Sequence, residues 1–324
     1  MESNLALDVE NLTKYYNGFL AVDHIRFQVK SGEVFGFLGP NGAGKTTTIR
    51  MLCGLLTPSE GRASVMDFDI QKETVEAKRQ IGVVPEISNL YDELTSFENL
   101  VFMGQLYGVP KNQRKKRSEE LIQLVRLEAK RDIPFSGLSK GMKRSLTIAA
   151  ALVHDPPLIF LDEPTSGLDV GSARNLRTMI RQLNGRGTTI FLTTHNIEEA
   201  NHLCHRIAVL VKGKIIAVDT PEALKKSVQG KSMVEFGMEN PNLPDLLDSI
   251  KAFDSVDTVN RRQDHFVIGF KGGPPWGSFL LYLQERGVSV TSINTLQPTL
   301  EDAFVKITGL DREMMMIEKE GKKG

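Results

Sequence analysis

The sequence lacks several features that would each assign it to a particular class of protein. Its 324 residues include two cysteines, Cys53 and Cys204, and both stand in apolar surroundings typical of a core. The 40 acidic and 40 basic residues cancel, so no net positive charge favours binding to nucleic acid. No apolar run approaches the roughly 18 residues of a membrane-spanning helix. These absences argue against a disulfide-rich protein, a nucleic-acid-binding protein and a chain that spans a membrane by itself.

The chain nevertheless has the composition of a folded protein. Hydrophobic residues make up 40% of it and prolines number 14, which is typical of globular chains. Its length exceeds that of a single typical domain. Its first residues, Met1–Asn4, begin neither a signal peptide nor a transit peptide, which predicts a cytoplasmic location.

A glycine-rich segment follows the apolar run Val34–Leu38 and precedes a predicted helix over Thr46–Leu56. Its glycines let the backbone curl so that N–H groups point at phosphate oxygens, and the helix adds its positive end. Lys45 can reach the β- and γ-phosphates, and the Thr46 hydroxyl can bind Mg²⁺. A glycine-rich turn without nucleotide is the alternative, which the Lys-Thr pair in register disfavours. The segment predicts a nucleoside triphosphate site formed by Gly39, Pro40, Asn41, Gly42, Ala43, Gly44, Lys45, Thr46 and Thr47.

Two carboxylates follow a second apolar run, Leu158–Leu161, which is typical of a buried parallel strand. Ligands of parallel sheets bind at the carboxyl ends of the strands. Asp162 can therefore hold Mg²⁺ through water, and Glu163 can polarise an attacking water. An exposed acidic loop is the alternative, but it does not explain why two acids directly follow so apolar a strand.

Three further segments are weaker signals. Ser139 is a natural N-cap for a helix that runs to about Val153, and it would offer a hydroxyl and free N–H groups to an anion. Asp169 closes a Ser-Gly-Leu-Asp segment, and His195 ends the apolar strand Thr189–Thr194, where an imidazole could reach a γ-phosphate. Taken singly, a helix cap, a turn and a strand-end histidine are the favoured interpretations.

Taken together, in this order and at this spacing, the motifs resemble those of the ATP-binding cassette (ABC) ATPases. The resemblance covers about residues 5 to 225. The matching positions are Tyr16 for the adenine-stacking aromatic, Gly39–Thr46 for Walker A, Ser139 and Gly141 for the signature motif, Leu158–Asp162 for Walker B, Glu163 for the catalytic carboxylate, Asp169 for the D-loop and His195 for the switch histidine.

The resemblance implies an ATPase with ATP and Mg²⁺ as cofactors and Lys45, Glu163 and His195 as catalytic residues. It implies a head-to-tail dimer, a homodimer or a heterodimer, in which two ATP molecules lie between one protomer's Walker motifs and the other's signature helix. It also implies separate transmembrane permease subunits, which would hold the chain on the cytoplasmic face of the membrane.

Two residues depart from the family pattern. Glu86, in Val84-Pro85-Glu86, stands where the family usually has a glutamine that faces Mg²⁺ and the attacking water. Its carboxylate keeps an oxygen ligand for the metal but adds negative charge near the phosphates. Lys140 replaces the first glycine of the signature pair and places a cation beside a polyphosphate site. We expect both at the ATP site and expect hydrolysis to be retained.

The predicted fold class is α/β. A P-loop NTPase sheet carries an N-terminal antiparallel β subdomain and a helical insertion over about residues 87–153, and a small C-terminal α/β domain follows. The predicted domains are residues 1–229 for the nucleotide-binding domain, 230–309 for the accessory domain and 310–324 for a flexible tail.

The predicted elements of the small domain include a capped final helix. Thr299 and Asp302 would start that helix as a capping pair. The Pro298–Phe304 string resembles the C-terminal extension of ATPases from the multidrug and antibiotic export branch. The other predicted elements are strands over 232–236, 265–270 and 287–294 and helices over 242–252 and 276–286.

Some alternatives remain open from the sequence. The basic run from Lys111 to Arg117 fits a solvated helix face as well as contact with an anionic membrane or partner. The function is predicted to be that of an exporter's ATPase subunit. A soluble, non-transport ABC ATPase and a regulatory ATP-binding module are the alternatives.

Overall fold

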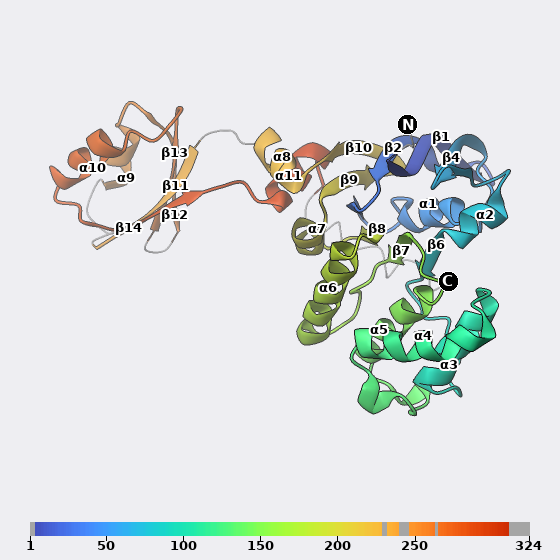
Figure 1. The fold of residues 1–324 in the computed structure, drawn as a ribbon. Coiled ribbons are helices and arrows are strands. Elements are labelled where there is room, and N and C mark those ends of the chain that lie inside the picture. Colours follow the sequence, from blue (N-terminus) through green and yellow to red (C-terminus); the bar gives the residue numbers. More distant parts are fainter. Residues whose placement is uncertain (1–3, 229–231, 240–245, 263–264, 311–324) are drawn as a thin grey trace, which may run out of the picture. The chain divides into compact units, whose positions relative to one another are not determined.

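The computed structural model describes residues 4–228, 232–239, 246–262 and 265–310 (Figure 1). The described chain divides into two compact units. The first runs to Pro221 and resumes at Ile307, and the second spans Glu222–Lys306. Of the predicted tail, only Leu310 lies among the described residues. No helix in the described ranges is both long enough and apolar enough to cross a membrane.

The first unit begins with an antiparallel sheet of four strands, which confirms the predicted N-terminal antiparallel β subdomain. Their order is β2-β1-β4-β5. Buried side chains alternate with exposed ones along much of β2, because one face of the sheet packs on the core. The strands are β1 (Leu5–Tyr16), β2 (Phe19–Lys30), β4 (Glu60–Val65) and β5 (Phe68–Asp69).

A second sheet of six strands, ordered β10-β9-β3-β8-β7-β6, holds the predicted nucleotide loop. The central strands are buried along their whole length, which explains their continuous apolar sequences. All neighbours pair in parallel except β9 and β10. The strands are β3 (Val34–Leu38), β6 (Ile81–Val84), β7 (Leu158–Asp162), β8 (Thr189–Thr194), β9 (Arg206–Val211) and β10 (Lys214–Asp219).

Aromatic rings fill the space between these two sheets. Phe27 on β2 lies 4.9 Å from the Phe37 ring centre and 5.5 Å from that of Phe35. Phe191 on β8 and Phe160 on β7 continue this cluster, 5.3 Å apart. Rings at these distances and tilts are well packed, so the cluster anchors the strands that carry the site residues.

The helices that accompany these sheets are α1 (Lys45–Leu52), α2 (Thr74–Arg79), α6 (Val170–Gly185) and α7 (Ile197–Leu203).

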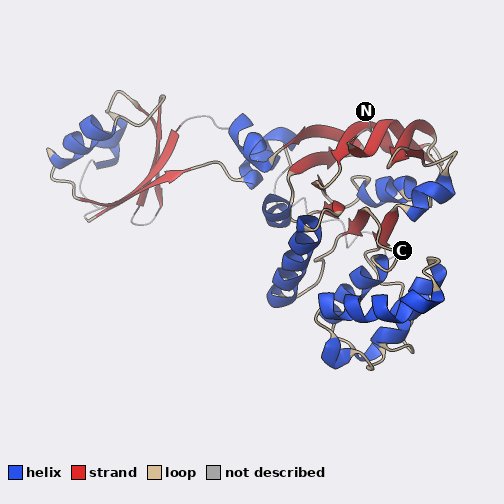
Figure 2. Cartoon of the chain, viewed as in Figure 1, coloured by secondary structure: helices blue, strands red, loops and turns tan. Residues whose placement is uncertain are grey.

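Between β6 and β7 the chain forms the predicted helical insertion (Figure 2). A capping box of Thr95 and Glu98 starts its first helix. The second helix begins at Lys111, so the basic run from Lys111 to Arg117 is itself helical. Ser139 caps the third helix, as predicted, by accepting a hydrogen bond from the Met142 N–H at 3.3 Å. The helices are α3 (Ser96–Leu106), α4 (Lys111–Leu124) and α5 (Lys140–Ala151).

The second unit contains a βαββαβ arrangement whose four strands pair antiparallel in the order β12-β13-β11-β14. Helices α9 and α10 contribute the apolar residues that cover one face of this sheet. The elements are α8 (Pro221–Ser227), β11 (Ser232–Met238), α9 (Leu246–Lys251), β12 (Val256–Arg262), β13 (His265–Phe270), α10 (Trp276–Gln284), β14 (Val290–Leu296) and α11 (Leu300–Thr308).

Most predicted elements of this unit are confirmed, with shifted ends. The capping pair at the start of α11 is present, since the Asp302 N–H donates to Thr299 Oγ1 at 3.1 Å and the Thr299 N–H to Asp302 Oδ2 at 2.8 Å. The first part of the predicted helix 242–252 lies outside the described residues. The sequence analysis missed β12, because its outer positions are polar and carry little apolar alternation.

Candidate functional site

The site lies where β3, β7 and β8 end side by side. A pocket of about 300 Å³ opens there, at the carboxyl edge expected of a parallel sheet. Most of the residues predicted to bind the nucleotide line this pocket. Its lining consists of Tyr16, Phe19, Ala21, Asn41, Gly42, Gly44, Lys45, Thr46, Thr47, Glu86, Glu163 and His195.

The loop between β3 and α1 wraps around the Lys45 side chain. The buried ammonium donates to the carbonyl oxygens of Gly39 at 2.7 Å and Pro40 at 3.1 Å. A Cβ on Gly39 would lie 2.1 Å from the Leu210 carbonyl oxygen, so no larger residue fits there. Gly44 adopts φ +103 in the turn before the helix, a conformation that side chains rarely allow. The fold therefore requires glycine at both positions. Ala43 is buried, and its carbonyl accepts the Gly213 N–H at 3.0 Å.

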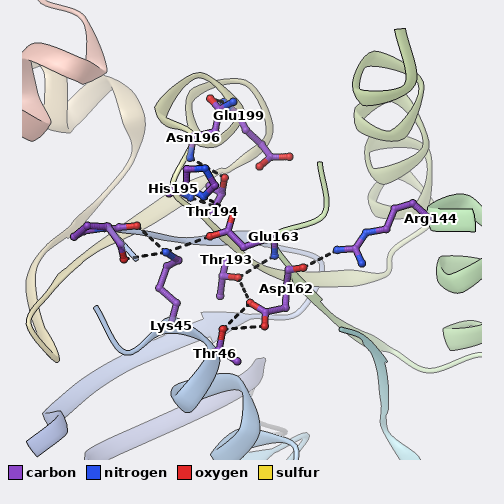
Figure 3. A network of polar contacts seen from close by, with 12 residues as sticks. Lys45, Thr46, Arg144, Asp162, Glu163, Thr193, Thr194, His195, Asn196 and Glu199 are labelled. Atoms are coloured by element: carbon purple, nitrogen blue, oxygen red, sulfur yellow. Dashed lines mark hydrogen bonds and ion pairs between the residues drawn. The ribbon is translucent and has the colours of Figure 1, made fainter. Parts of the chain in front are cut away.

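Asp162 at the end of β7 is held by two hydroxyl groups (Figure 3). Thr46 Oγ1 donates to its carboxylate at 3.0 Å and Thr193 Oγ1 at 2.5 Å. Thr193 also accepts the Glu163 N–H at 3.1 Å, so one hydroxyl positions both acidic residues. The sequence analysis overlooked Thr193. The sequence offered one sign of its role, because Thr193 is a polar residue near the carboxyl end of an apolar strand. In the structure, the register between β7 and β8 places it opposite Asp162.

Glu163 has an unusual backbone and a crowded side chain. Its φ of 47 lies in the left-handed region, which is uncommon for a residue with a side chain and often found at functional sites. One carboxylate oxygen lies 3.2 Å from Lys45 Nζ and the other 2.8 Å from His195 Nδ1. Burial acts to raise the pKa of Glu163, but the His195 hydrogen bond and the Lys45 charge outweigh it and hold the pKa below its usual value. The carboxylate is therefore ionised at neutral pH.

Arg144 on α5 ties this site to the helical insertion, a role that sequence reasoning missed. Its buried guanidinium donates to the carbonyl oxygens of Asp162 at 2.6 Å and Pro164 at 2.9 Å, and also to those of Pro85 and Glu86. It thereby joins the chain after β7 to the chain after β6. Arg144 stands in a basic stretch at the start of a helix, which is typical of a solvated surface. The pattern of the sequence therefore did not predict that its side chain is buried.

Glu199 on α7 is a second buried charged side chain near the site that the sequence did not single out. Burial raises its pKa, and the negative charge of Glu163 adds to that shift.

The remaining predicted site residues lie elsewhere in this protomer. Ser139 and Gly141 line a different cavity of about 260 Å³ together with Ser172, next to the start of α6. Asp169 caps α6 by accepting the Ser172 N–H at 2.9 Å. Lys140 borders Gly167, where an added Cβ would lie 2.2 Å from its Nζ. The structure thus brings the Walker residues together and sets the signature residues apart from them.

The oxygen atoms of Thr46 and Asp162 fit a hard divalent cation. A hydroxyl and a carboxylate 3.0 Å apart offer the oxygen ligands that Mg²⁺ prefers, with phosphate and water completing its shell. The described residues contain no cluster of three or more His, Cys, Asp or Glu side chains that could hold a metal alone.

Comparison with known proteins identifies the family. A family model described as ABC transporter matches residues 22–166. The Nod factor export ATP-binding protein I of Mesorhizobium japonicum is 43% identical over 96% of this chain and 89% of its own length. The linearmycin resistance ATP-binding protein LnrL of Bacillus subtilis is 36% identical over 94% of this chain and 98% of its own. The chain belongs to the ABC transporter ATP-binding proteins.

Solved ABC structures agree with this membership. An ATP-binding subunit of an ABC transporter matches with a TM-score of 0.62 and 31% identity over 68% of this chain and 92% of its own. The dimeric cassette MJ0796, in a post-hydrolysis state bound to ADP and Pi, matches with a TM-score of 0.61 and 28% identity over 66% of this chain and 98% of its own. This cassette is accordingly an ATP-binding and ATP-hydrolysing subunit of an ABC transporter, and the predicted fold class is confirmed. ABC ATPases of this kind dimerise and work with transmembrane subunits. The soluble, non-transport alternative is not favoured.

Proposed function

We propose that this cassette drives export through separate membrane-spanning permease subunits and lies at the cytoplasmic face of the membrane through them. The single observation that carries the ATPase part is the cluster of Lys45, Asp162, Glu163 and His195 at the ends of neighbouring strands. The export part rests on the relatives, one named for Nod factor export and one for linearmycin resistance.

In the proposed mechanism the loop from Gly39 to Thr46 binds the triphosphate through its N–H groups, and Lys45 neutralises phosphate charge. Glu163 is ionised and faces the same pocket, so it can accept the proton of an attacking water as general base. His195 orients Glu163 through the 2.8 Å contact and offers its ring to the γ-phosphate. Tyr16, 40% exposed at the pocket wall, is the proposed platform for adenine.

Mg²⁺ would be held by Thr46 and Asp162, with Glu86 as a further oxygen ligand at the pocket wall. When bound, the ion neutralises charge on the β- and γ-phosphates. The protein's own contribution is orientation. Thr193 holds the Asp162 carboxylate and the Glu163 backbone N–H, and Arg144 links the Asp162 carbonyl to that of Glu86. Movement of the helical insertion would therefore be transmitted to the reacting groups.

We propose further that the active form is a head-to-tail homodimer. Ser139 and Gly141 lie outside the phosphate pocket of their own protomer, so they would contact the ATP bound by the partner. Lys140 would add a cation beside that phosphate chain, and Asp169 would lie at the same interface.

Purification of the tagged chain from solubilised membranes tests the export proposal. We expect a partner chain with several membrane-spanning helices and Mg²⁺-dependent ATPase activity in the complex. Lys45→Ala should retain the partner but lose ATP-induced thermal stabilisation, because the lysine binds the ligand. A partner that acts on nucleic acid or translation factors, or normal stabilisation of Lys45→Ala, would contradict the proposal.

Mixed dimers test the head-to-tail arrangement. Ser139→Arg and Glu163→Gln should each be inactive alone. A mixed dimer carries one site with both defects and one intact site, so mixing should restore activity. The helix cap contributes about 0.5–2 kcal/mol, so folding of Ser139→Arg is checked by thermal unfolding first. Proven mixed dimers without recovered activity would contradict independent head-to-tail sites.

A further inference from the structure

Among the described residues, β14 is the last strand at one side of the second unit's sheet. β14 pairs with β11 on one side, and within the described residues no strand pairs with its other side (Figure 1). Within the part of the chain that the structure describes, no backbone N–H or C=O group on that side has a partner, which is the arrangement that favours strand addition. Two apolar side chains on this edge strand are also exposed, Ile293 by 39% and Leu296 by 36%.

The two edges of this sheet are composed differently. The opposite edge, β12, carries Asp257, Arg261 and Arg262, and charged residues are a common protection against unwanted strand pairing. β14 has the sequence VTSINTL, with no charged residue and no proline along seven positions. It also consists largely of β-branched residues, which favour extended structure. An edge so exposed and so unprotected is typical of a pairing surface.

We propose that β14 pairs antiparallel with β14 of a second copy of this chain and joins the two four-stranded sheets into one. The inference rests on the homodimer proposed above. A two-fold axis through Ile293 would align all seven residues of both strands. It sets Val290 opposite Leu296, Thr291 opposite Thr295, and Ser292 opposite Asn294. Each pair matches apolar with apolar or polar with polar, and no like charges meet.

A second copy fits this edge better than an unrelated peptide because the strand is complementary to itself. A symmetric contact of this kind is isologous, so one surface serves both protomers and the assembly closes at two chains.

Cysteine cross-linking of the full-length chain tests the register. Cys53 and Cys204 are 2% and 7% exposed, so background cross-linking is low. Residues directly opposite in an antiparallel pair have Cα atoms roughly 4.5–5.5 Å apart, within reach of a disulfide. Ile293→Cys should therefore cross-link to itself under mild oxidation.

Off-centre positions supply the matched control. Thr291→Cys should not cross-link with itself, since a four-residue offset separates the two sulfurs by roughly 13 Å. Mixing it with Thr295→Cys should restore a cross-link. We expect at least about tenfold more dimer for Ile293→Cys and for the mixture than for Thr291→Cys alone. Equal yields at all three would overturn the proposed pairing.

Charge substitutions test the same contact without a covalent cross-link. Ile293→Lys sets two lysines opposite each other and should abolish nucleotide-independent dimers seen by analytical ultracentrifugation. Mixing it with Ile293→Glu should restore them. Asn260→Lys, on the protected edge β12, should leave them unchanged.

The two proposals fail in different ways. If ATP assembles the Glu163→Gln dimer but Ile293→Cys does not cross-link, the strand pairing is wrong and the cassette dimer stands. If neither assembly forms, both proposals fail. Dimers unaffected by Ile293→Lys, or captured on β14 by a membrane subunit instead of a second copy, would also overturn the pairing.

Discussion

The two units of this chain differ in what they bury. The first unit buries several charged side chains, among them Glu33, Lys45, Arg144, Asp162 and Glu163. Among the described residues of 222–306, no polar or charged side chain is buried. The core of the second unit is apolar and includes a cluster of aromatic rings, in which the ring centre of Phe279 lies 5.1–5.3 Å from those of Phe236, Phe253 and Phe270.

This difference shows that the first unit, which holds the ATP site, includes buried charged groups that are unfavourable for stability. Burying charge is unfavourable unless partners compensate for lost solvation, so such groups persist mainly where chemistry needs them. In the first unit the compensation is visible as backbone carbonyl contacts to Lys45 and Arg144. The described part of the second unit carries no such cost.

Glu163→Gln should have the largest effect of these substitutions, and the quantity it lowers is the ATP turnover of the first unit. Loss of a general base typically lowers turnover about 10²- to 10⁴-fold, while ATP binding should be retained because Lys45 and the loop are intact. Single-turnover ATPase assays and nucleotide-binding titrations separate the two. Turnover within threefold of the unchanged protein would remove Glu163 from the role of base.

Phe279→Ala should do the opposite and damage only the second unit. Its ring is 1% exposed, and truncating a buried phenylalanine costs about 3–5 kcal/mol. Hydrogen exchange should show this loss in β11, β13 and α10, with ATPase activity retained at low temperature. Leu281→Ala, 61% exposed on the same helix, is the matched control. A parallel collapse of ATPase activity would mean that the two units are energetically coupled.

Arg144→Lys should show how the helical insertion is connected to the site. Lysine keeps the charge but cannot reach carbonyls on both loops, and a displacement of about 1 Å at reacting groups can cost about 10²-fold. We expect kcat to fall by that order while the KM for ATP changes little. Lys143→Ala, on the same helix with its side chain 31% exposed, should leave both parameters near normal. An equal loss in both variants would indicate a general folding defect.

Glu86→Gln should have the smallest effect. Both side chains present an oxygen to the pocket, so activity should stay within about tenfold, roughly 1.4 kcal/mol in barrier height. Glu86→Ala should lose more, and it should weaken stimulation by the permease. Mg²⁺-dependent ATPase rates, measured with and without the permease, test both predictions. Unchanged behaviour of Glu86→Ala would make the carboxylate a bystander.

How well the sequence predicted an element depended on the kind of signal that the element contains, in both units. Val34–Leu38, His265–Phe270 and Thr189–Thr194 were predicted to the residue, since apolar runs bounded by polar residues mark buried strands. β12 was missed, because an edge strand with polar outer positions has weak periodicity. The predicted helix over Thr46–Leu56 ends earlier, at Leu52, before the turn at Gly54, whose φ is +63.

The sequence by itself determined the family, the phosphate loop and the identities of the acidic pair and the histidine, because those depend on local spacing and residue type. Only the tertiary structure decided how Thr193, Arg144 and Glu199 join them, because these contacts cross between strands and helices far apart in the chain. It also decided which strand of the second unit lies at an edge. Strand order depends on long-range pairing, and no local pattern of side chains encodes it.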